Sequence, residues 1–430
     1  MSPVIKNTEE LSQTPLRADA LAIAEAGYAA IDIGNVLTKK VSFVDGVLRI
    51  GDATYPIGGR RVFFVGVGKC AVQGGRALEA LLGDALESGI AVDVSTPTEK
   101  DSSKIEVLVG THPLPTAANE NASERIIDFL SGRQENDLII MLISGGGSTL
   151  LCLPNATMTP EDEAELFSQL TAHAAPIAEL NVVRKHISRA RGGALASASY
   201  PAEVLSLIVS DVPGDDISII ASGPSVRDAS TVADAQAILE KYGLEFSPQL
   251  ALRETEKDAR YFERVTNTLL LSSQDALGAM EAEAARRGYA PRIVETHFSG
   301  EAREVGRTVV ETLHASAPKT ALLYAGESTV TLGDSSGKGG RNQEMALAAL
   351  ESVQPDELVL PFASDGHDNT DHAGAIGDEL THQHAVGNSL VPKEYLEAHR
   401  SYDFFKETGD ALLTEPVASN VSDLIVALKG

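Results

Sequence analysis

The chain of 430 residues is 43% hydrophobic and 22% charged, a globular composition that excludes a disordered chain. Its length exceeds one ordinary hydrophobic core and predicts two domains. The formal net charge of 35 − 61 = −26 argues against nucleic-acid or membrane partners. It also means that an anionic metabolite can bind only where Arg, Lys or backbone N–H groups are concentrated.

The two cysteines, Cys70 and Cys152, are too few for a disulfide framework or a Cys-rich metal site, which indicates a reducing compartment. The first residues lack the pattern of a signal peptide, and no apolar run is long enough to cross a bilayer. We therefore expect a cytoplasmic protein, present as a monomer or a homodimer.

Short apolar runs alternate along the chain with segments of helical periodicity. The predicted strands are residues 61–65, 90–94, 105–109, 138–143, 204–209, 269–271, 321–324, 358–362 and 424–428. The predicted helices between them include residues 76–82, 122–130, 275–287 and 342–350. With no Trp and only 5% aromatic residues, the core is aliphatic, which suits parallel strands covered by helices. The pattern predicts an α/β fold with doubly wound parallel sheets.

Residues 242–264 are the best candidate for a domain boundary. They contain Gly243, Pro248 and a polar, charged run with little strand character, and a new strand-then-helix unit follows. We place an N-terminal α/β domain at residues 1–250 and a second α/β domain at residues 262–430.

Five predicted strands are followed directly by polar, glycine-rich or acidic turns, and open α/β sheets bind ligands at the carboxyl ends of their strands. The first turn, with Gly66, Gly68 and Lys69, opens a helix. Its glycines allow close approach of the backbone, and Lys69 and the helix N-terminus would attract an anion, although a plain turn is equally acceptable. With Ala71 the run also fits the looser G-x-G-x-x-A dinucleotide fingerprint, so a Rossmann cofactor site stays open. A Walker A motif is excluded by its spacing and by Cys70.

The second turn is a glycine loop made of Ser144, Gly145, Gly146, Gly147 and Ser148. Three consecutive glycines form a backbone nest whose N–H groups converge on phosphate oxygens, and the serines can add donors. A structural turn rarely needs three glycines in a row, so this loop favours phosphate or carboxylate binding.

The third turn is acidic and contains Asp211, Asp215 and Asp216. Carboxylates in a rigid turn can bind Mg²⁺ directly or through water, although we expect at least one of the three only to cap or form the turn. No His or Cys stands beside them, which favours Mg²⁺ over Zn²⁺.

The fourth and fifth turns follow strands of the second half and contain Glu327 and Asp365. Either carboxylate could accept a proton from a substrate hydroxyl or hold a metal ion, and either could be a plain surface residue. His112 follows the strand 105–109, and we interpret it as a turn histidine.

Two basic groups supply the positive charge that an anionic substrate needs. Arg184 and Lys185 lie in a predicted helix start, and Arg341 with Asn342 opens another helix. Cations at a helix N-terminus oppose the helix dipole, which favours an anionic ligand there over a salt-bridged surface.

Together these segments resemble the glycerate kinases whose C-terminal half is called the MOFRL domain. The resemblance runs almost end to end, in matching order and spacing, through GVGK, THPLP, LISGGGSTLL, NVVRKHIS, SDVPGDD, GESTVT, GKGGRNQEMALAAL and SDGHDNTDHAGAI. It implies a Rossmann-like N-terminal domain, a C-terminal α/β domain with a MOFRL segment at residues 320–428, and an active site in the interdomain cleft. It also implies ATP- and Mg²⁺-dependent phosphorylation of D-glycerate at the 2-hydroxyl, giving 2-phosphoglycerate and ADP.

The resemblance carries over to Lys69, the glycine loop 144–148, Arg184, Lys185, Asp211, Arg341 and Asp365. Together with the turns above, it predicts Lys69, Arg341 and Asp365 as catalytic residues and Asp211 and Asp215 as metal ligands. The predicted substrate- and nucleotide-binding residues are Gly66, Gly68, Ser144, Gly145, Gly146, Gly147, Ser148, Arg184, Lys185, Glu327 and Asn342.

The chain departs from the family pattern at four places. Cys70 follows the GVGK lysine, Arg191 stands where a lysine often precedes the Gly-Gly pair, and residues 414–420 read TEPVASN in place of TGPTGTN. The SDGHD segment contains His367 and is followed by Asn369, where smaller or different residues are common. The altered last loop puts its substrate contacts in doubt and could indicate a different hydroxy acid.

Phosphoryl transfer depends mainly on positioning and charge neutralisation. The glycine loop and Lys69 would hold phosphate oxygens, and the acidic turn would hold Mg²⁺. Arg184 or Arg341 would bind the glycerate carboxylate. Asp365, or otherwise Glu327, would orient or deprotonate the attacking hydroxyl.

Three other functions compete with glycerate phosphorylation. A kinase for another small polyhydroxy acid fits the same motifs, and a hydroxypyruvate reductase fits the G-x-G-x-x-A run. A non-catalytic sugar-phosphate sensor would also use the glycine loop. The acidic turn argues against the last two, because neither hydride transfer nor simple anion binding needs carboxylates near phosphate.

Overall fold

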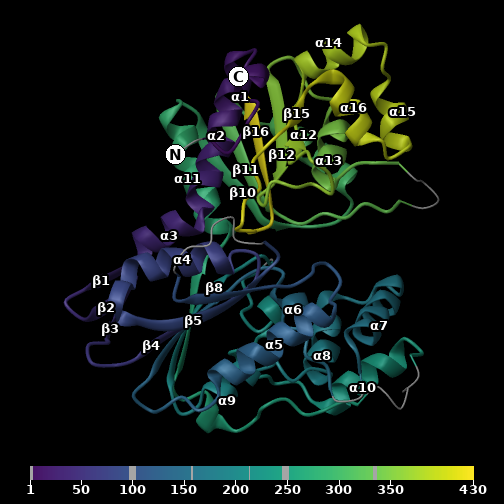
Figure 1. Cartoon of the computed structure of the whole chain (residues 1–430). Coiled ribbons are helices and arrows are strands. Elements are labelled where there is room, and N and C mark those ends of the chain that lie inside the picture. Colours follow the sequence, from purple (N-terminus) through teal and green to yellow (C-terminus); the bar gives the residue numbers. More distant parts are fainter. Residues whose placement is uncertain (1–2, 96–102, 156–157, 213, 245–250, 333–336) are drawn as a thin grey trace. The chain divides into compact units, whose positions relative to one another are not determined.

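The computed structural model of the chain describes residues 3–95, 103–155, 158–212, 214–244, 251–332 and 337–430. It divides into two compact units: unit 1 comprises Met1–Asp32 and Leu271–Gly430, and unit 2 comprises Ile33–Leu270 (Figure 1). No single described helix is long and apolar enough to cross a membrane. Among the described helices, one bent pair, α2 (Pro15–Ile31) with α3 (Ile33–Lys40), reaches that length and apolarity together.

Unit 2 is built on a six-stranded sheet with the spatial order β6-β5-β4-β7-β8-β9. In that order the strands are Ile105–Val109, Leu86–Asp93, Val62–Val67, Leu138–Ile143, Glu203–Val209 and Val265–Leu271. The strands from β6 to β8 are all parallel to their neighbours. The central strands β4 and β7 are buried along their whole length, which explains their continuous apolar sequences.

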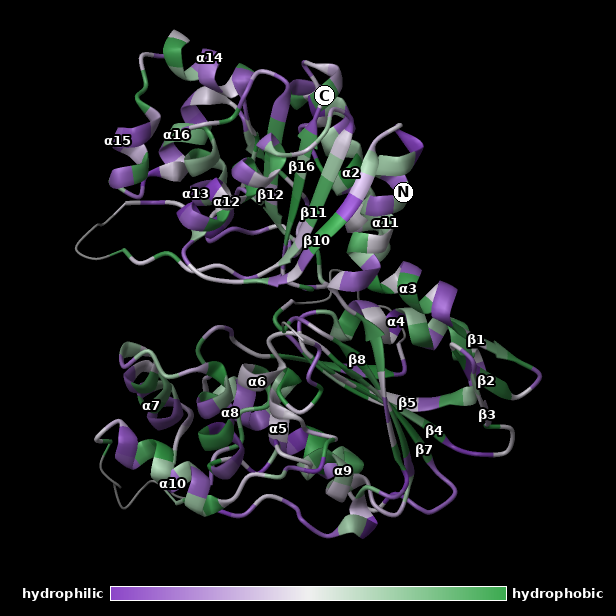
Figure 2. Cartoon of the chain, turned by 180° about the vertical axis from the view of Figure 1, so that it is seen from behind, coloured by the Kyte–Doolittle hydropathy of each residue, from purple (hydrophilic) through white to green (hydrophobic). Residues whose placement is uncertain are grey.

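Helices cover both faces of this sheet (Figures 1 and 2). Helix α4 (Ala71–Leu82) lies on one face, and α5 (Ala117–Leu130), α6 (Gly147–Leu150) and α9 (Ala194–Ser199) lie on the other. The core on the second face joins Phe63 and Val65, alternate residues of β4, to Ile126 of α5 and Leu195 of α9. The predicted doubly wound arrangement is confirmed for this unit.

Smaller elements complete unit 2. Helices α7 (Pro160–Ala172), α8 (Ile177–His186) and α10 (Val232–Lys241) pack together through Leu166, Val183 and Leu239. Three 3₁₀ turns are η1 (Gly83–Ala85), η2 (Ile220–Ser222) and η3 (Ala259–Tyr261). A separate antiparallel sheet contains β1 (Val41–Val44), β2 (Val47–Ile50) and β3 (Ala53–Pro56). The sequence analysis missed this sheet, because four-residue strands give too short a pattern to recognise.

Unit 1 contains a mixed sheet, which corrects the expectation of parallel sheets throughout. Its spatial order is β10-β11-β16-β12-β13-β15, and β14 pairs with β12. The strands are β10 (Ala290–Phe298), β11 (Thr320–Gly326), β12 (Glu357–Ala363), β13 (Gly374–Ala375), β14 (Gly377–Asp378), β15 (Ala411–Leu412) and β16 (Asp423–Lys429). Strand β16 is antiparallel to both β11 and β12. A buried apolar run has the same pattern in either direction, so the sequence could not give the direction of this strand.

Helices also lie on both faces of the unit 1 sheet (Figures 1 and 2). Helices α2 and α11 (Ser273–Arg286) lie on one face, and α12 (Ala302–His314) and α13 (Arg341–Ala349) lie on the other. The short α1 (Thr8–Leu11) precedes α2. Helices α14 (Glu379–Gly387), α15 (Pro392–Glu397) and α16 (Ser401–Thr408) form a second core with α13 through Leu347, Leu396 and Phe404.

The N-terminal residues 3–32 pack with the C-terminal half of the chain, whereas the sequence analysis placed residues 1–250 in one domain. The reason is a buried ion network. Arg17 of α2 is fully buried and donates to the two oxygens of Asp378 at 2.7 and 2.6 Å and to Asp410 at 2.7 Å. Such a contact, across more than 360 positions of the chain, leaves no local pattern in the sequence.

The other boundary also differs from the predicted one. The charged run after residue 250 packs on unit 2: the backbone N–H of Arg253 donates to the carbonyl of His186 (2.8 Å), and the Thr255 hydroxyl donates to Asp228 (3.0 Å). Residues 245–250, which include Pro248, lie outside the described residues. The polar composition that suggested a linker therefore belongs, from residue 251 on, to a structural network.

Candidate active site

The loops that follow β4 and β7 lie against each other at the carboxyl edge of the unit 2 sheet. The backbone N–H of Lys69 donates to the carbonyl of Gly145 (3.0 Å), and that of Ser144 donates to the carbonyl of Val67 (2.8 Å). Gly68 has a φ of 120°, and a side chain there would overlap with Ser144. Only glycine permits this approach, which brings the first two predicted motifs together.

The glycine loop turns at Gly146, which has a left-handed φ of 77°. A Cβ atom placed there would lie 3.2 Å from Cγ of Lys69 and 3.4 Å from Cδ2 of His112. The Lys69 side chain therefore lies over the loop, where it can add a full charge to the backbone N–H groups. His112, interpreted from the sequence as a turn histidine, lies at the same place.

The two serines of the loop have structural contacts. Ser144 is 2% exposed, and its hydroxyl lies 3.4 Å from the carbonyl oxygen of Val67. The hydroxyl of Ser148 lies 2.9 Å from that of Ser222, which donates to Oδ1 of Asn181 in α8 (2.7 Å). These contacts fix the loop between the sheet and α8, and Ser148 remains partly exposed.

Two of the predicted binding glycines are buried against protein atoms. Gly66 lies inside β4, where a Cβ atom would come within 3.0 Å of both Phe64 and Ala71. Gly147 packs against η2, because a Cβ atom there would lie 2.6 Å from Cβ of Ala221. Both glycines allow close packing, and no described contact supports a direct role in ligand binding.

The acidic turn reaches the glycine loop through Asp211. A side chain at Gly145 would overlap with the Asp211 carboxylate, so this carboxylate lies directly over the loop. Asp216 accepts the backbone N–H of Ser218 (2.9 Å) and so acts as a cap, as expected for one of the three. Asp215 is partly exposed in a left-handed conformation, and Pro213 of this turn lies outside the described residues.

The described residues contain no group of three or more His, Cys, Asp or Glu side chains that could hold a metal ion. This is compatible with Mg²⁺, which commonly uses one or two protein carboxylates and takes its other ligands from phosphate and water. Asp211 fits this requirement by its oxygen donors and by its place over the glycine loop. The role of Asp215 stays a prediction.

Arg184, Lys185 and His186 form the last turn of α8, which corrects the predicted helix start. The helix begins at Ile177, and the helix dipole favours cations at its C-terminal end. Their position on the helix is therefore no argument for an anionic ligand, and each side chain must be judged by its own contacts.

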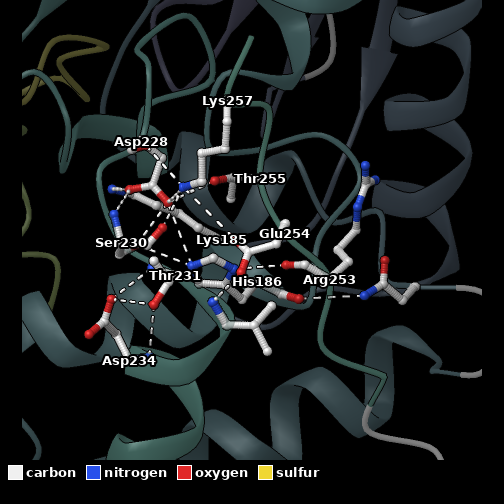
Figure 3. Close-up of polar contacts among 12 residues, drawn as sticks. Lys185, His186, Asp228, Ser230, Thr231, Asp234, Arg253, Glu254, Thr255 and Lys257 are labelled. Carbon is white, nitrogen blue, oxygen red and sulfur yellow. Dashed lines mark hydrogen bonds and ion pairs between the residues drawn. The ribbon is translucent and has the colours of Figure 1, made fainter.

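Lys185 is part of a buried structural network (Figure 3). It is 6% exposed, and its Nζ donates to Oδ1 of Asp228 at 3.2 Å. His186 lies in the same network, with Nε2 3.2 Å from the hydroxyl of Ser230. The Nζ of Lys257 donates to the backbone carbonyl of Asp228 (3.0 Å). The Lys185 ammonium already has a carboxylate partner, so we do not retain it as a substrate ligand.

Arg184 has the opposite environment. Its guanidinium lies over the ring of Phe167 at 4.1 Å, and its buried Nε has no hydrogen-bond partner in the described part of the chain. Burial, followed by the neighbouring charge of Arg191, lowers the pKa of Arg184 to about 10. Arg184 is one helical turn from Asn181, which contacts the glycine loop through Ser222. Arg184 is thus a half-buried cation that an anionic ligand would stabilise.

The start of α4 does not offer a dinucleotide site. The backbone N–H of Val72 donates to Oδ2 of Asp93 (3.1 Å), and Ser95 donates twice to Oδ1 of Asp93. Asp93 is 1% exposed at the end of β5, and burial raises its pKa. A pyrophosphate at this helix terminus would meet a carboxylate that already accepts the N–H group. The sequence analysis missed Asp93, although an acidic residue at the end of an apolar strand was a usable signal.

A second polar group lies in unit 1, at the start of α13. Arg341 donates to Asp423 and to Glu327, each at 2.5 Å. Burial raises the pKa of Asp423 to about 7, and the Arg341 charge opposes this rise. A cavity of about 330 Å³ next to this group is lined by residues that include Arg341, Gly340 and Ser328. The structure therefore pairs two predicted site residues, Arg341 and Glu327, with each other, and it adds Asp423 as a second partner of Arg341 that the sequence analysis did not single out.

Asn342 and Asp365 complete the predicted residues of unit 1. Asn342 is fully buried, and its backbone and side-chain N–H groups donate to Oδ1 of Asp368 at 3.1 and 3.2 Å. Asp365 is partly exposed and accepts the backbone N–H of His367 (3.2 Å). Asn342 thus has a structural partner, and the catalytic role of Asp365 stays a prediction.

The altered loop 414–420 packs on the segment that contains Asp365. The backbone N–H of Val417 donates to the Asp365 carbonyl (3.1 Å), and the Thr414 hydroxyl donates to the carbonyl of Gly366 (3.2 Å). Glu415, the acidic residue gained in this loop, forms an exposed ion pair with Lys6 at 2.9 Å. The added charge is therefore paired at the surface of unit 1.

The fold and the unit 2 site define an α/β protein that collects a glycine loop, a lysine and a carboxylate at the carboxyl ends of parallel strands, an arrangement suited to phosphate chemistry. The model of a domain of unknown function, DUF4147, matches residues 19–255, and that of the MOFRL family matches residues 320–423.

A D-glycerate 2-kinase from Thermotoga maritima is 34% identical over 378 residues, which cover 86% of this chain and 90% of that protein. A putative hydroxypyruvate reductase from Agrobacterium vitis is 38% identical, over 86% of this chain and 87% of that protein. The crystal structure of a glycerate kinase from Thermotoga maritima has a TM-score of 0.84 and 31% identity, and the match covers 95% of this chain and 98% of that one. The chain belongs to the DUF4147 and MOFRL family of glycerate kinases, and the predicted family is confirmed.

Proposed function

We propose that this protein phosphorylates D-glycerate with ATP at the 2-hydroxyl, giving 2-phosphoglycerate and ADP. The observation that carries the proposal is the convergence of Lys69, the glycine loop and Asp211 at one edge of the unit 2 sheet. The names of the relatives as D-glycerate 2-kinase and glycerate kinase support it.

The roles follow from charge. The glycine loop and Lys69 would hold phosphoryl oxygens, and Asp211 would hold Mg²⁺, which neutralises phosphate charge when bound. Arg184 would bind the glycerate carboxylate, because its guanidinium has no carboxylate partner in the described part of the chain and can donate two parallel hydrogen bonds. Arg341 is a weaker candidate for this role, since two carboxylates already accept from it. Asp365 is retained as the proposed acceptor of the hydroxyl proton.

The experiment is to incubate the purified protein with D-glycerate, ATP and Mg²⁺, to follow ADP release, and to identify the product by phosphorus NMR. Lys69→Ala should lose turnover while the fold remains, because Lys69 is only partly buried. Lys39→Ala, an exposed lysine of the same unit, is the matched control and should turn over normally. Production of 3-phosphoglycerate would correct the position, and the absence of ADP release would reject the activity.

A hydroxypyruvate reductase is the second candidate, because the relative from Agrobacterium vitis has that name. The Asp93 carboxylate at the end of β5 argues against it, since it already accepts a backbone N–H group at the start of α4 that a dinucleotide pyrophosphate would need. Oxidation of NADH or NADPH by hydroxypyruvate, with no phosphorylation of D-glycerate, would favour the reductase.

A further inference from the structure

His112 is held over the glycine loop by a built scaffold. The loop after β6 is tied down by Asn119 of α5, which is fully buried. The Asn119 Oδ1 accepts the backbone N–H of Thr111 (3.0 Å), and its Nδ2 donates to the carbonyls of Thr111 (2.9 Å) and Thr149 (3.1 Å). Thr149 lies in α6, directly after the glycine loop. One buried amide therefore fixes the backbone before His112 to the helix that begins in the glycine loop.

A second contact closes the same connection from the other side of His112. The Thr149 hydroxyl donates to the carbonyl of Pro113 at 3.3 Å, and the Thr111 hydroxyl donates to the carbonyl of Leu114 at 2.7 Å. The residues on both sides of His112 are thus fixed relative to α6. The imidazole itself is exposed, with Cδ2 near the position that a Gly146 side chain would occupy.

Lys69 and His112 flank that position together. A Cβ atom at Gly146 would lie 3.2 Å from Cγ of Lys69, 3.6 Å from its Cε and 3.4 Å from Cδ2 of His112. In a protein of net charge −26, two nitrogen-bearing side chains next to a backbone nest are a local concentration of donors. An exposed turn histidine would not need two threonines and a buried asparagine to hold its loop.

We infer that His112 is a ligand-contacting residue whose ring N–H donates to a phosphoryl oxygen held by the glycine loop and Lys69. This inference rests on the proposed phosphate role of that loop. It adds the loop after β6 to the loops after β4, β7 and β8 that the proposed function uses. Asn119 is then a positioning residue, because it acts through the backbone that presents His112.

The test measures binding of inorganic pyrophosphate by calorimetry, with Mg²⁺ present, to His112→Ala, His112→Gln and wild-type protein. Pyrophosphate supplies phosphoryl oxygens without nucleoside or carboxylate. Loss of a hydrogen bond to a charged oxygen should weaken binding by His112→Ala about 10- to 100-fold. His112→Gln retains an N–H donor and should recover most of the affinity. Leu114→Ala, an exposed side chain of the same loop, should bind like the wild type and excludes a general loosening of the loop.

Binding of D-glycerate alone separates the phosphoryl group from a carboxylate as the contact, and it should change less than threefold in His112→Ala. Wild-type affinity of His112→Ala for pyrophosphate would overturn the inference, as would a loss confined to D-glycerate or no pyrophosphate binding by the wild type. A failure of the proposed function is distinguishable, because the histidine-dependent pyrophosphate affinity is measured without any turnover.

Discussion

Removing the Arg17 guanidinium should destabilise unit 1 selectively. Arg17 and Asp410 are fully buried and Asp378 is 5% exposed, so Arg17→Met would leave two buried carboxylates without their main cation. Removing one partner of a buried ion pair costs about 3–5 kcal/mol. His384, whose Nδ1 lies 3.1 Å from Asp410, can compensate one carboxylate in part. The expected loss therefore stays within this range although two buried carboxylates lose their cation.

The loss should be localised as well as large. Unit 1 has 32 + 160 = 192 residues, and a domain of this size loses roughly 2–4 °C in Tm per kcal/mol, so we expect a fall of about 6–20 °C. Because two units need not unfold together, the assay is hydrogen exchange with mass spectrometry in increasing urea, with peptides of each unit followed separately.

Two further variants make this prediction specific. Arg286→Met removes an arginine of the same unit whose side chain is 68% exposed, and it should cost less than about 0.5 kcal/mol. Adding Asp378→Asn and Asp410→Asn to Arg17→Met removes the unpaired charges and should recover part of the loss. A loss below about 1 kcal/mol, or equal losses in peptides of both units, would refute the argument that this network attaches residues 3–32 to unit 1.

Three other perturbations follow from single sites. Burial raises the pKa of Asp423 to about 7, above the value of about 3.9 for an unfolded Asp. The contribution of Asp423 to stability is therefore full below pH ~4 and is lost as the pH rises through 7. Urea unfolding should show a lower stability at pH 8 than at pH 5 in the wild type, and a smaller difference in Asp423→Asn. Gly146→Ala places a side chain at a φ of 77° and against Lys69, so turnover with glycerate and ATP should fall at least about tenfold while circular dichroism stays unchanged. The guanidinium of Arg191 donates to the buried Glu163 at 2.7 and 3.1 Å, and Arg191→Lys removes one of these two hydrogen bonds. Urea unfolding of unit 2 should show a loss of stability of about 1–3 kcal/mol. A stability equal to the wild type would contradict the need for arginine at this departure from the family pattern.

The sequence predicted the central strands of the six-stranded sheet in unit 2 because burial on both faces leaves continuous apolar runs. Strands 105–109 and 138–143 were predicted with their observed ends, β6 and β7. The direction of β16 and the attachment of α2 to unit 1 could not be predicted in this way. Both depend on pairing between distant segments, which apolar periodicity does not encode.

Two adjacent residues of the site show a sharper limit of prediction from the sequence. Arg184 and Lys185 have the same charge and share one motif, yet Lys185 pairs with Asp228 whereas Arg184 stacks on Phe167 without a carboxylate in the described part of the chain. Successive residues of a helix project about 100° apart, so one faces the network of Figure 3 and the other faces α7. A motif that names both as substrate ligands therefore assigns this role to two residues, whereas the contacts are compatible with it for Arg184 alone.

The dinucleotide fingerprint fails for a related physical reason. A G-x-G-x-x-A turn binds pyrophosphate only if the helix that follows keeps its N-terminal N–H groups free. Here Asp93 accepts one of them, and Gly68 lies directly against Ser144 of the next loop. The first glycine turn therefore supports the glycine loop and presents Lys69. The backbone nest lies instead at the partly exposed Gly146, after the neighbouring strand β7. Two glycine-rich turns that look like alternative phosphate sites in the sequence are, in the fold, two halves of one proposed site.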